Sequence, residues 1–203
     1  MDTQFDVKAW RRGERERLLA LRMAHSAQER AVRAERITAA LDRLLVDQPA
    51  ATVSFYWPFR GEFDLRSWIA SRLASGARAA LPVVVEKRQP MIFRRWSPGC
   101  RMERGIWNIP VPSDGPELIP DVVIAPLVGF DPDKFRLGYG GGYFDRTLAS
   151  LPAKPLVVGI GLASTRLETI HPQDWDIPMD AIITEESPFG EDALAQARRG
   201  MAC

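Results

Sequence analysis

The sequence predicts an α/β fold, and two patterns along its 203 residues support that prediction. Apolar runs at residues 121–127, 155–162 and 181–184 are continuous rather than alternating, which is typical of strands buried on both faces of a sheet. Segments with helical spacing separate the strands, and this alternation favours a mainly parallel sheet. We therefore expect a single three-layer α/β domain over residues 1–203, with the sheet between helices and an N-terminal helical segment, residues 1–48, packed on it.

Two helices are expected at the N-terminus. Residues 7–23 carry leucines among many arginines and glutamates, which predicts an exposed helix. Ser26 followed by Glu29 has the spacing of a capping box and predicts the start of a second helix. The apolar face of that helix is predicted by spacings of three and four residues between Ala34, Ile37, Leu41 and Leu44.

Shorter elements follow before the first long apolar run. Pro82 lies within an expected strand at residues 79–85, and proline cannot donate to a sheet ladder, so we expect an edge strand or a bulge there. A closing helix is expected at residues 191–199. The other expected elements are a strand at 52–57 ended by Pro58, a helix at 65–74 closed by Ser75 and Gly76, and a strand at 91–96.

Composition narrows the class of protein. With 46% hydrophobic and 26% charged residues and a formal net charge of +1, the chain has the profile of a soluble globular protein. Acidic residues are interleaved with the N-terminal arginines, which indicates a solvated helix surface; a nucleic-acid patch is the alternative interpretation. The two cysteines, Cys100 and Cys203, form no metal-binding or disulfide pattern. Neither a signal peptide nor an apolar run of membrane length is present, so we expect a cytoplasmic protein with no nucleic-acid or membrane partner.

A glycine-rich loop after the run at 121–127 is the strongest functional signal. Glycines let a backbone approach a phosphate, and the N-terminus of a following helix, expected at residues 143–151, adds a favourable dipole. Arg136 supplies a charged fork and Asp145 an oxygen ligand of the kind Mg²⁺ prefers. A tight turn with no ligand is the alternative. The loop is Arg136-Leu137-Gly138-Tyr139-Gly140-Gly141-Gly142-Tyr143-Phe144-Asp145.

This loop, together with residues 126–131 before it, resembles the signature of the 5-formyltetrahydrofolate cyclo-ligase family, also called methenyltetrahydrofolate synthetases. The resemblance extends over nearly the whole chain and implies a NagB/RpiA/CoA transferase-like fold. The further motifs, in order, are Tyr56-Trp57-Pro58, Glu62-Phe63-Asp64, residues 81–84, residues 105–112 and residues 176–184.

The resemblance implies an ATP- and Mg²⁺-dependent conversion of 5-formyltetrahydrofolate to 5,10-methenyltetrahydrofolate, with release of ADP and phosphate. Phosphorylation of the formyl oxygen makes that oxygen a leaving group, and N10 of the folate attacks the activated carbon. This chemistry needs positioning and charge neutralisation rather than a protein nucleophile.

Site residues are implied in the same way. The ATP-binding residues are Arg11, Arg15, Arg136, Leu137, Gly138, Tyr139, Gly140, Gly141, Gly142, Tyr143 and Phe144. The substrate-binding residues are Trp57, Glu62 and Tyr139 to Tyr143 (Tyr139, Gly140, Gly141, Gly142, Tyr143). Arg136 and Tyr143 are the catalytic candidates, and Asp145 and Asp176 the metal ligands.

Several positions depart from the family pattern, among them Glu14 in place of leucine and Trp175 in place of a frequent histidine. Arg11 replaces a lysine, Gly141 replaces a lysine present in some members, and Lys134 replaces a frequent glycine. Alternatives remain for several residues: a solvated helix face for Arg11 and Arg15, core packing for Trp57, and a turn for Asp176.

Two alternatives also remain for the whole protein. The first is a non-catalytic nucleotide- or folate-binding relative of the same fold. The second is a different ATP-using enzyme that acts on another formyl or amide substrate. We expect a monomer, with a homodimer as the alternative.

Overall fold

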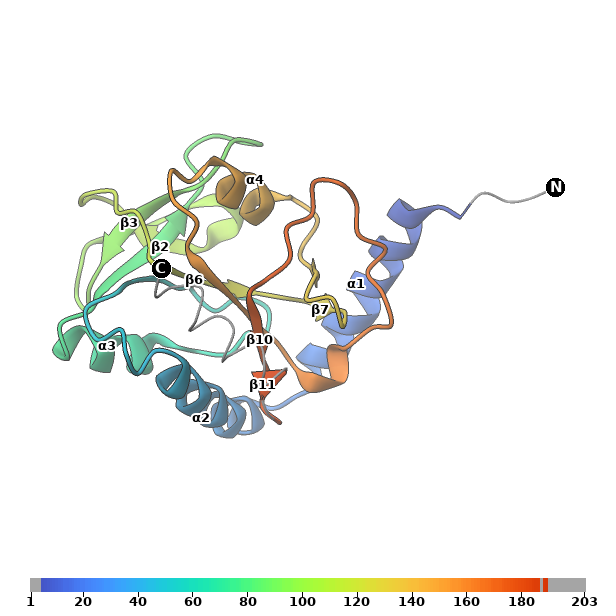
Figure 1. The fold of residues 1–203 in the computed structure, drawn as a ribbon, viewed down its shortest axis with the longest axis horizontal. Coiled ribbons are helices and arrows are strands. Elements are labelled where there is room, and N and C mark those ends of the chain that lie inside the picture. The colour runs from blue at the N-terminus through green and yellow to red at the C-terminus, as the bar shows by residue number, and fades with distance from the viewer. Residues whose placement is uncertain (1–4, 187, 190–203) are drawn as a thin grey trace.

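The computed structural model describes residues 5–186 and 188–189, and its elements form three layers (Figure 1). Helices α2 (Ala27–Leu44) and α3 (Arg66–Ala74) cover one face of the main sheet. Helix α4 (Tyr143–Ser150) covers the other face. The predicted α/β fold with a sheet between helices is therefore confirmed.

The main sheet has seven strands within the described residues. The five central strands, from β10 to β2, run parallel, and the two outer strands, β3 and β11, are antiparallel to their neighbours. In spatial order the strands are β11 (Pro188–Phe189), β10 (Ala181–Ile183), β9 (Leu156–Ile160), β6 (Val122–Pro126), β1 (Thr52–Ser54), β2 (Arg78–Val83) and β3 (Ile92–Trp96).

Alternating side chains of the central strand β6 explain the continuous apolar run. Val122 and Ile124 pack with α2 and α3, whereas Val123 and Ala125 pack on the side of α4. Successive side chains of a strand point to opposite faces, so a strand covered on both faces must be apolar at every position.

The edge position expected for the strand containing Pro82 is wrong, because β2 lies between β1 and β3. Strand β1 pairs with β2 only as far as Ser54 opposite Ala80. Pro82 lies two residues beyond Ala80, so its backbone nitrogen faces the side where β1 has already ended. The missing N–H therefore costs no ladder hydrogen bond.

Two small hairpins were not predicted. One pairs β4 (Met102–Arg104) with β5 (Pro110–Pro112), and a 3-10 turn at Ile106–Asn108 joins them. The other, β7 (Gly129–Phe130) with β8 (Arg136–Leu137), lies between β6 and the glycine-rich loop. A second 3-10 turn, Ala163–Thr165, follows β9.

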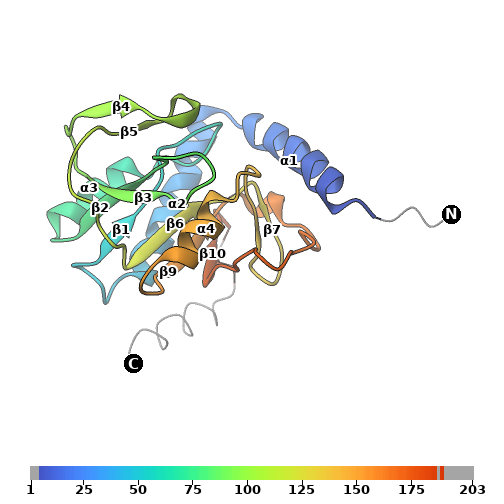
Figure 2. The same cartoon turned by 90° about the horizontal axis from the view of Figure 1, so that it is seen from above.

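Helix α1 (Val7–Met23) packs on the β7–β8 hairpin, and Figure 2 shows the two on the same side of the molecule. Leu18 is fully buried there among Val128, Leu137 and Ile170. The predicted capping box is confirmed at the start of α2, with reciprocal bonds between Ser26 and Glu29.

None of the described helices has the length and apolar composition needed to cross a membrane. The helix expected at residues 191–199 lies outside the described residues.

Candidate active site

A cavity of about 370 Å³ opens at the carboxyl ends of the parallel strands β1, β2 and β6. This is the edge at which open α/β sheets bind ligands. All the residues that the sequence predicted for binding and catalysis line this cavity. They are Arg11, Arg15, Trp57, Glu62, Arg136 to Asp145 and Asp176.

The glycine-rich loop runs from β8 into α4, which begins at Tyr143 as predicted. Gly140 and Gly142 have φ angles of 92° and 62°, a left-handed region that other residues rarely adopt. Gly142 caps α4 without a side-chain hydrogen bond. The N–H groups of the first turn of α4 therefore lack a capping side chain and can donate to an anion.

Arg136, on β8, forms a buried ion pair with Asp145 in the first turn of α4. Their closest atoms are 2.8 Å apart, and the two side chains are 5% and 16% exposed. Asp145 also accepts a 3.2 Å bond from the Ile177 N–H. Burial lowers the pKa of Arg136 from its ordinary value, whereas the nearby carboxylates of Asp145 and Asp176 raise it. The pair attaches the start of α4 to the hairpin.

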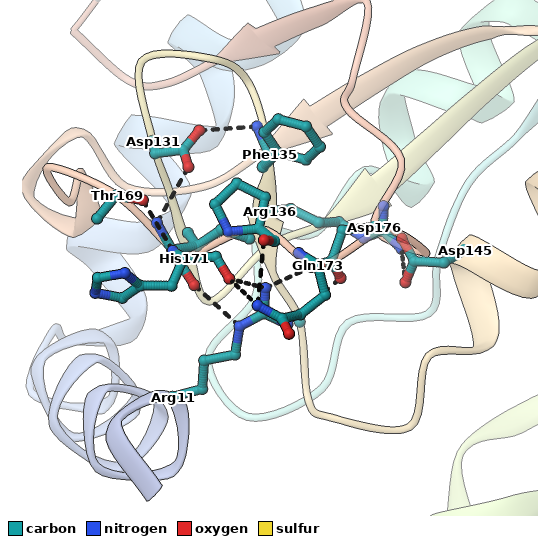
Figure 3. A network of polar contacts seen from close by, with 12 residues as sticks. Arg11, Asp131, Phe135, Arg136, Asp145, Thr169, His171, Gln173 and Asp176 are labelled. Atoms are coloured by element: carbon teal, nitrogen blue, oxygen red, sulfur yellow. Dashed lines mark hydrogen bonds and ion pairs between the residues drawn. The ribbon is translucent and has the colours of Figure 1, made fainter. Parts of the chain in front are cut away.

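Arg11 and Arg15 both reach the cavity from α1, but they are bound differently. Arg11 donates from Nε to the Ile170 carbonyl and from Nη2 to the His171 carbonyl, both at 2.9 Å, and it pairs with Asp176 (Figure 3). Asp176 accepts a further 2.8 Å bond from the Gln173 N–H. Arg11 therefore fastens the segment 170–176 to the helix.

Arg15 has fewer partners. Its Nε donates to the Gly138 carbonyl at 2.7 Å, and its two terminal amino groups have no protein acceptor among the described residues. Burial lowers the pKa of Arg15, and the neighbouring positive charge of Arg11 adds to that effect. A partly buried cation with free donors beside a glycine loop can bind an anion.

Glu62 lies across the cavity and is 8% exposed. The Tyr139 hydroxyl donates to its Oε1 at 2.7 Å, and the Phe59 N–H donates to its Oε2 at 2.9 Å. Burial raises the pKa of Glu62 to about 7, although Arg22 and these hydrogen bonds act against the rise. Burial also raises the pKa of Tyr139, so the phenol keeps its proton.

Trp57 lies between the core and the cavity, and its predicted role in substrate binding stays a prediction. It packs partly against the core shared with α2 and α3, and its remaining surface lines the cavity. The guanidinium of Arg66 lies 4.6 Å from the centre of its ring.

Trp107 is a cavity residue that no sequence argument assigned. It lies in the turn Ile106–Asn108 with a φ angle of 56°, is 57% exposed, and meets the Tyr143 ring edge-on at 5.5 Å. The family motif at residues 105–112 was recognised, but a tryptophan between two short strands carries no signal of its own. Trp175, which is 67% exposed, also lines the cavity.

Asp145 and Asp176 are the carboxylates available for a metal ion. The described residues contain no group of three or more histidine, cysteine or acidic side chains suited to a metal. Mg²⁺ commonly takes one or two carboxylates and completes its shell with phosphate and water. Two carboxylates beside a loop whose N–H groups can donate to an anion are therefore compatible with Mg²⁺ held jointly with a phosphate group.

The chain matches the model of the 5-formyltetrahydrofolate cyclo-ligase family over residues 7–185. It is 30% identical to the 5-formyltetrahydrofolate cyclo-ligase of Haemophilus influenzae over 147 residues, covering 69% of this chain and 79% of that protein. It is 33% identical to the Escherichia coli K12 protein of the same name over 142 residues, covering 66% and 78%. The structure resembles that of Aquifex aeolicus 5,10-methenyltetrahydrofolate synthetase, with a TM-score of 0.75, 29% identity, and coverage of 88% of this chain and 91% of that one.

Proposed function

The chain belongs to the 5-formyltetrahydrofolate cyclo-ligase family, and we propose that its cavity binds ATP with Mg²⁺ beside 5-formyltetrahydrofolate and closes the folate ring. One observation carries the proposal. Two adjacent loop residues face opposite sides of one cavity: the Gly138 carbonyl holds Arg15, and the Tyr139 hydroxyl holds Glu62. The glycine-rich loop thus lies between a cationic wall and an acidic, aromatic wall.

On the cationic side, the proposed ATP phosphates meet Arg15, the loop backbone and the start of α4. Arg15 has free donors, and backbone N–H groups at a helix start attract anions. Arg136 supplies a second, buried positive charge behind the loop. Arg11, which the family resemblance assigns to ATP, reaches this site through Asp176.

Asp145 and Asp176 are the proposed Mg²⁺ ligands. A bound magnesium ion would neutralise phosphate charge and favour transfer of the γ-phosphoryl group. Each carboxylate is paired with an arginine. Metal binding would therefore draw the two carboxylates partly away from those arginines.

On the opposite side, Glu62 is the proposed acceptor for N–H groups of the folate. Trp57 and Trp107 offer aromatic surface to its rings, and stacking of this kind contributes to ligand binding. Tyr139 and Tyr143 also line the cavity, and they are the proposed contacts of the formyl group, which must meet the γ-phosphate.

The proposed reaction has two steps. The formyl oxygen attacks the γ-phosphorus, and the bond from that phosphorus to the bridging oxygen breaks, which releases ADP. N10 of the folate then attacks the activated formyl carbon and loses its proton, and the carbon–oxygen bond breaks to release phosphate. Arg136 neutralises the charge that develops, and Tyr143 orients the formyl group, so catalysis rests on positioning and electrostatics.

The test is a direct assay of turnover. Purified protein is mixed with 5-formyltetrahydrofolate, ATP and Mg²⁺, and the near-ultraviolet absorption of the methenyl product is followed. We expect product only when all three are present. Bound ATP without product would instead support the non-catalytic relative. Location in the cytoplasm and a monomeric state remain predictions.

A further inference from the structure

Arg22 lies behind the wall of the cavity rather than in it. It is in the last turn of α1, is 6% exposed, and is not among the residues that line the cavity. Burying a charged side chain is costly unless it is paired and hydrogen-bonded. The hydrogen-bond partners of Arg22 therefore indicate its structural role.

The guanidinium of Arg22 joins three segments that are distant in sequence. Nε donates to the Arg60 carbonyl at 2.9 Å, and Nη1 lies 3.4 Å from the Leu127 carbonyl, just after β6. Nη2 donates to the Tyr139 hydroxyl in the glycine-rich loop. A planar guanidinium is suited to such divergent acceptors, whereas a lysine ammonium has donors at a single atom.

The bond to Tyr139 fixes the direction of a second hydrogen bond. A phenol has one proton to donate. Because the Tyr139 oxygen accepts from Arg22, its own proton is directed to Glu62 Oε1, 2.7 Å away. Arg22 Nη1 is itself 4.0 Å from that carboxylate oxygen. Arg22, the Tyr139 hydroxyl and the Glu62 carboxylate thus form a chain of two hydrogen bonds, which holds the Tyr139 ring against Glu62.

Arg22 also supports the turn that carries Glu62. Arg60 and Gly61 have φ angles of 46° and 75°, and the Arg60 carbonyl is the acceptor for Arg22 Nε. Gly61 packs so closely on the helix end that an added Cβ would lie 3.2 Å from Met23 Sδ and 3.6 Å from Arg22 Cγ. Glu62 is therefore located from two directions, through its turn and through Tyr139.

We propose that Arg22 is a positioning residue for the reduced folate, acting through Glu62 and Tyr139 without touching the substrate itself. This inference rests on the proposed function, because it requires that Glu62 and Tyr139 contact the folate. It assigns to the end of α1 a role in folate binding, in addition to the role of Arg15 earlier in the same helix. Among the described residues, Arg22 has no bond to Arg15, Arg136 or Asp145 on the nucleotide side, and its bond to the glycine-rich loop is to the Tyr139 hydroxyl that turns toward Glu62. The affinity for ATP is therefore expected to depend on Arg22 far less than the affinity for folate.

The test compares Arg22→Lys with wild-type protein in binding and in turnover. We expect about a tenfold rise in KM for 5-formyltetrahydrofolate and in its calorimetric Kd, measured without ATP, because a charge-assisted hydrogen bond is misplaced. KM for ATP should change by less than about twofold, since no bond to the nucleotide side is lost. Arg17→Lys is the matched control, because Arg17 is on the same helix and Glu14 is its only ion-pair partner among the described residues.

A double-mutant cycle separates positioning from general stability. Because Arg22 acts partly through the Tyr139 hydroxyl and partly through the turn that carries Glu62, Arg22→Lys combined with Tyr139→Phe should weaken folate binding by clearly less than the sum of the two single losses. A fully additive loss, or a folate Kd unchanged in folded Arg22→Lys protein, would overturn the proposal. Circular dichroism establishes that each variant is native, and Arg22→Gln replaces the lysine variant, with the same expected shifts, if the latter does not fold.

The calorimetric comparison keeps the inference separate from the proposed function. Wild-type protein that binds folate but makes no methenyl product contradicts the proposed reaction and leaves the Arg22 comparison intact. Wild-type turnover together with an unaffected Arg22→Lys variant contradicts the Arg22 inference alone.

Discussion

The two sides of the cavity handle charge in different ways. On the nucleotide side, Arg11 and Arg136 are paired with Asp176 and Asp145, the same carboxylates that we propose for Mg²⁺. On the folate side, one carboxylate, Glu62, already has its hydrogen bonds and faces a buried cation across a hydroxyl. A metal ion on the first side must take its two carboxylates from their arginine partners, whereas the second side is set before its ligand arrives.

The largest effect is expected at the buried pair on the nucleotide side. Arg136→Ala or Asp145→Ala leaves a buried charge without its partner, which costs about 3–5 kcal/mol of unfolding free energy and should lower turnover at least a hundredfold. Urea unfolding and the absorption assay measure the two effects.

Removing both members of the pair separates stability from function. Arg136→Met with Asp145→Leu should recover much of the stability, because neither charge is then buried alone, but none of the turnover. Full turnover in either alanine variant would contradict the assignment of this pair to the active site.

Glu62 provides the next largest effect, and it depends on pH. Its folded pKa of about 7 exceeds its ordinary value of 4.5, so the folded protein retains a proton that the unfolded chain loses between these values. The contribution of Glu62 to the unfolding free energy should therefore fall from pH 4.5 to about 7 and level off above, by about 3 kcal/mol.

Glu62→Gln removes this titration. The unfolding free energy of Glu62→Gln minus that of wild type should consequently rise over the same pH range. A pH-independent difference between the two proteins does not affect this rise. Chemical unfolding at pH 5, 6, 7 and 8 gives the comparison. A difference that does not change with pH would show that Glu62 is ionised throughout in the folded protein.

Arg15 and Arg11 should separate direct from indirect contact with the nucleotide. Arg15→Ala is expected to weaken ATP binding about tenfold or more, with or without Mg²⁺, because it removes free charged donors. Arg11→Ala frees Asp176, so its effect should appear mainly when Mg²⁺ is present.

Calorimetric titration of ATP with and without Mg²⁺ gives both constants. If Arg11→Ala weakens ATP equally after removal of the metal, Arg11 binds phosphate directly, as the family resemblance implies. Arg11→Lys, which restores the family residue, is the informative partner variant.

The smallest effect is expected at Lys134, away from both sides. Lys134 has a φ angle of 66°, which glycine adopts without strain, and its Nζ donates to the Asp180 carbonyl at 3.2 Å. Lys134→Gly removes the strain of a left-handed backbone at a non-glycine residue and loses one partly buried hydrogen bond, so the unfolding free energy should change by less than about 1 kcal/mol. Thermal unfolding measures this change in stability. Turnover should be unchanged, and a clear loss would place Lys134 in the site.

Much of the fold could be predicted because its signals come from residues that are close together in the sequence. The bonds between Ser26 and Glu29 lie within one helical turn, and the apolar run around Val122 reports burial on both faces directly. The glycine-rich loop was also evident, since Gly140 and Gly142 need a left-handed backbone. The edge position predicted from Pro82 was wrong, because the neighbouring strand ends before it reaches the proline. Where a neighbouring strand ends depends on the arrangement of the sheet and cannot be read from β2 alone.

The sequence by itself determined the α/β class, the glycine-rich loop and the set of charged residues around it. Only the tertiary structure decided how those charges are paired. Arg11 meets a carboxylate 165 positions away, and Arg22 meets a hydroxyl 117 positions away. Both arginines occupy the same helix among many others, and helical periodicity contains no information about distant partners. Only the packing of α1 on the rest of the fold brings Arg11 to segment 170–176 and Arg22 to the residues that hold Glu62.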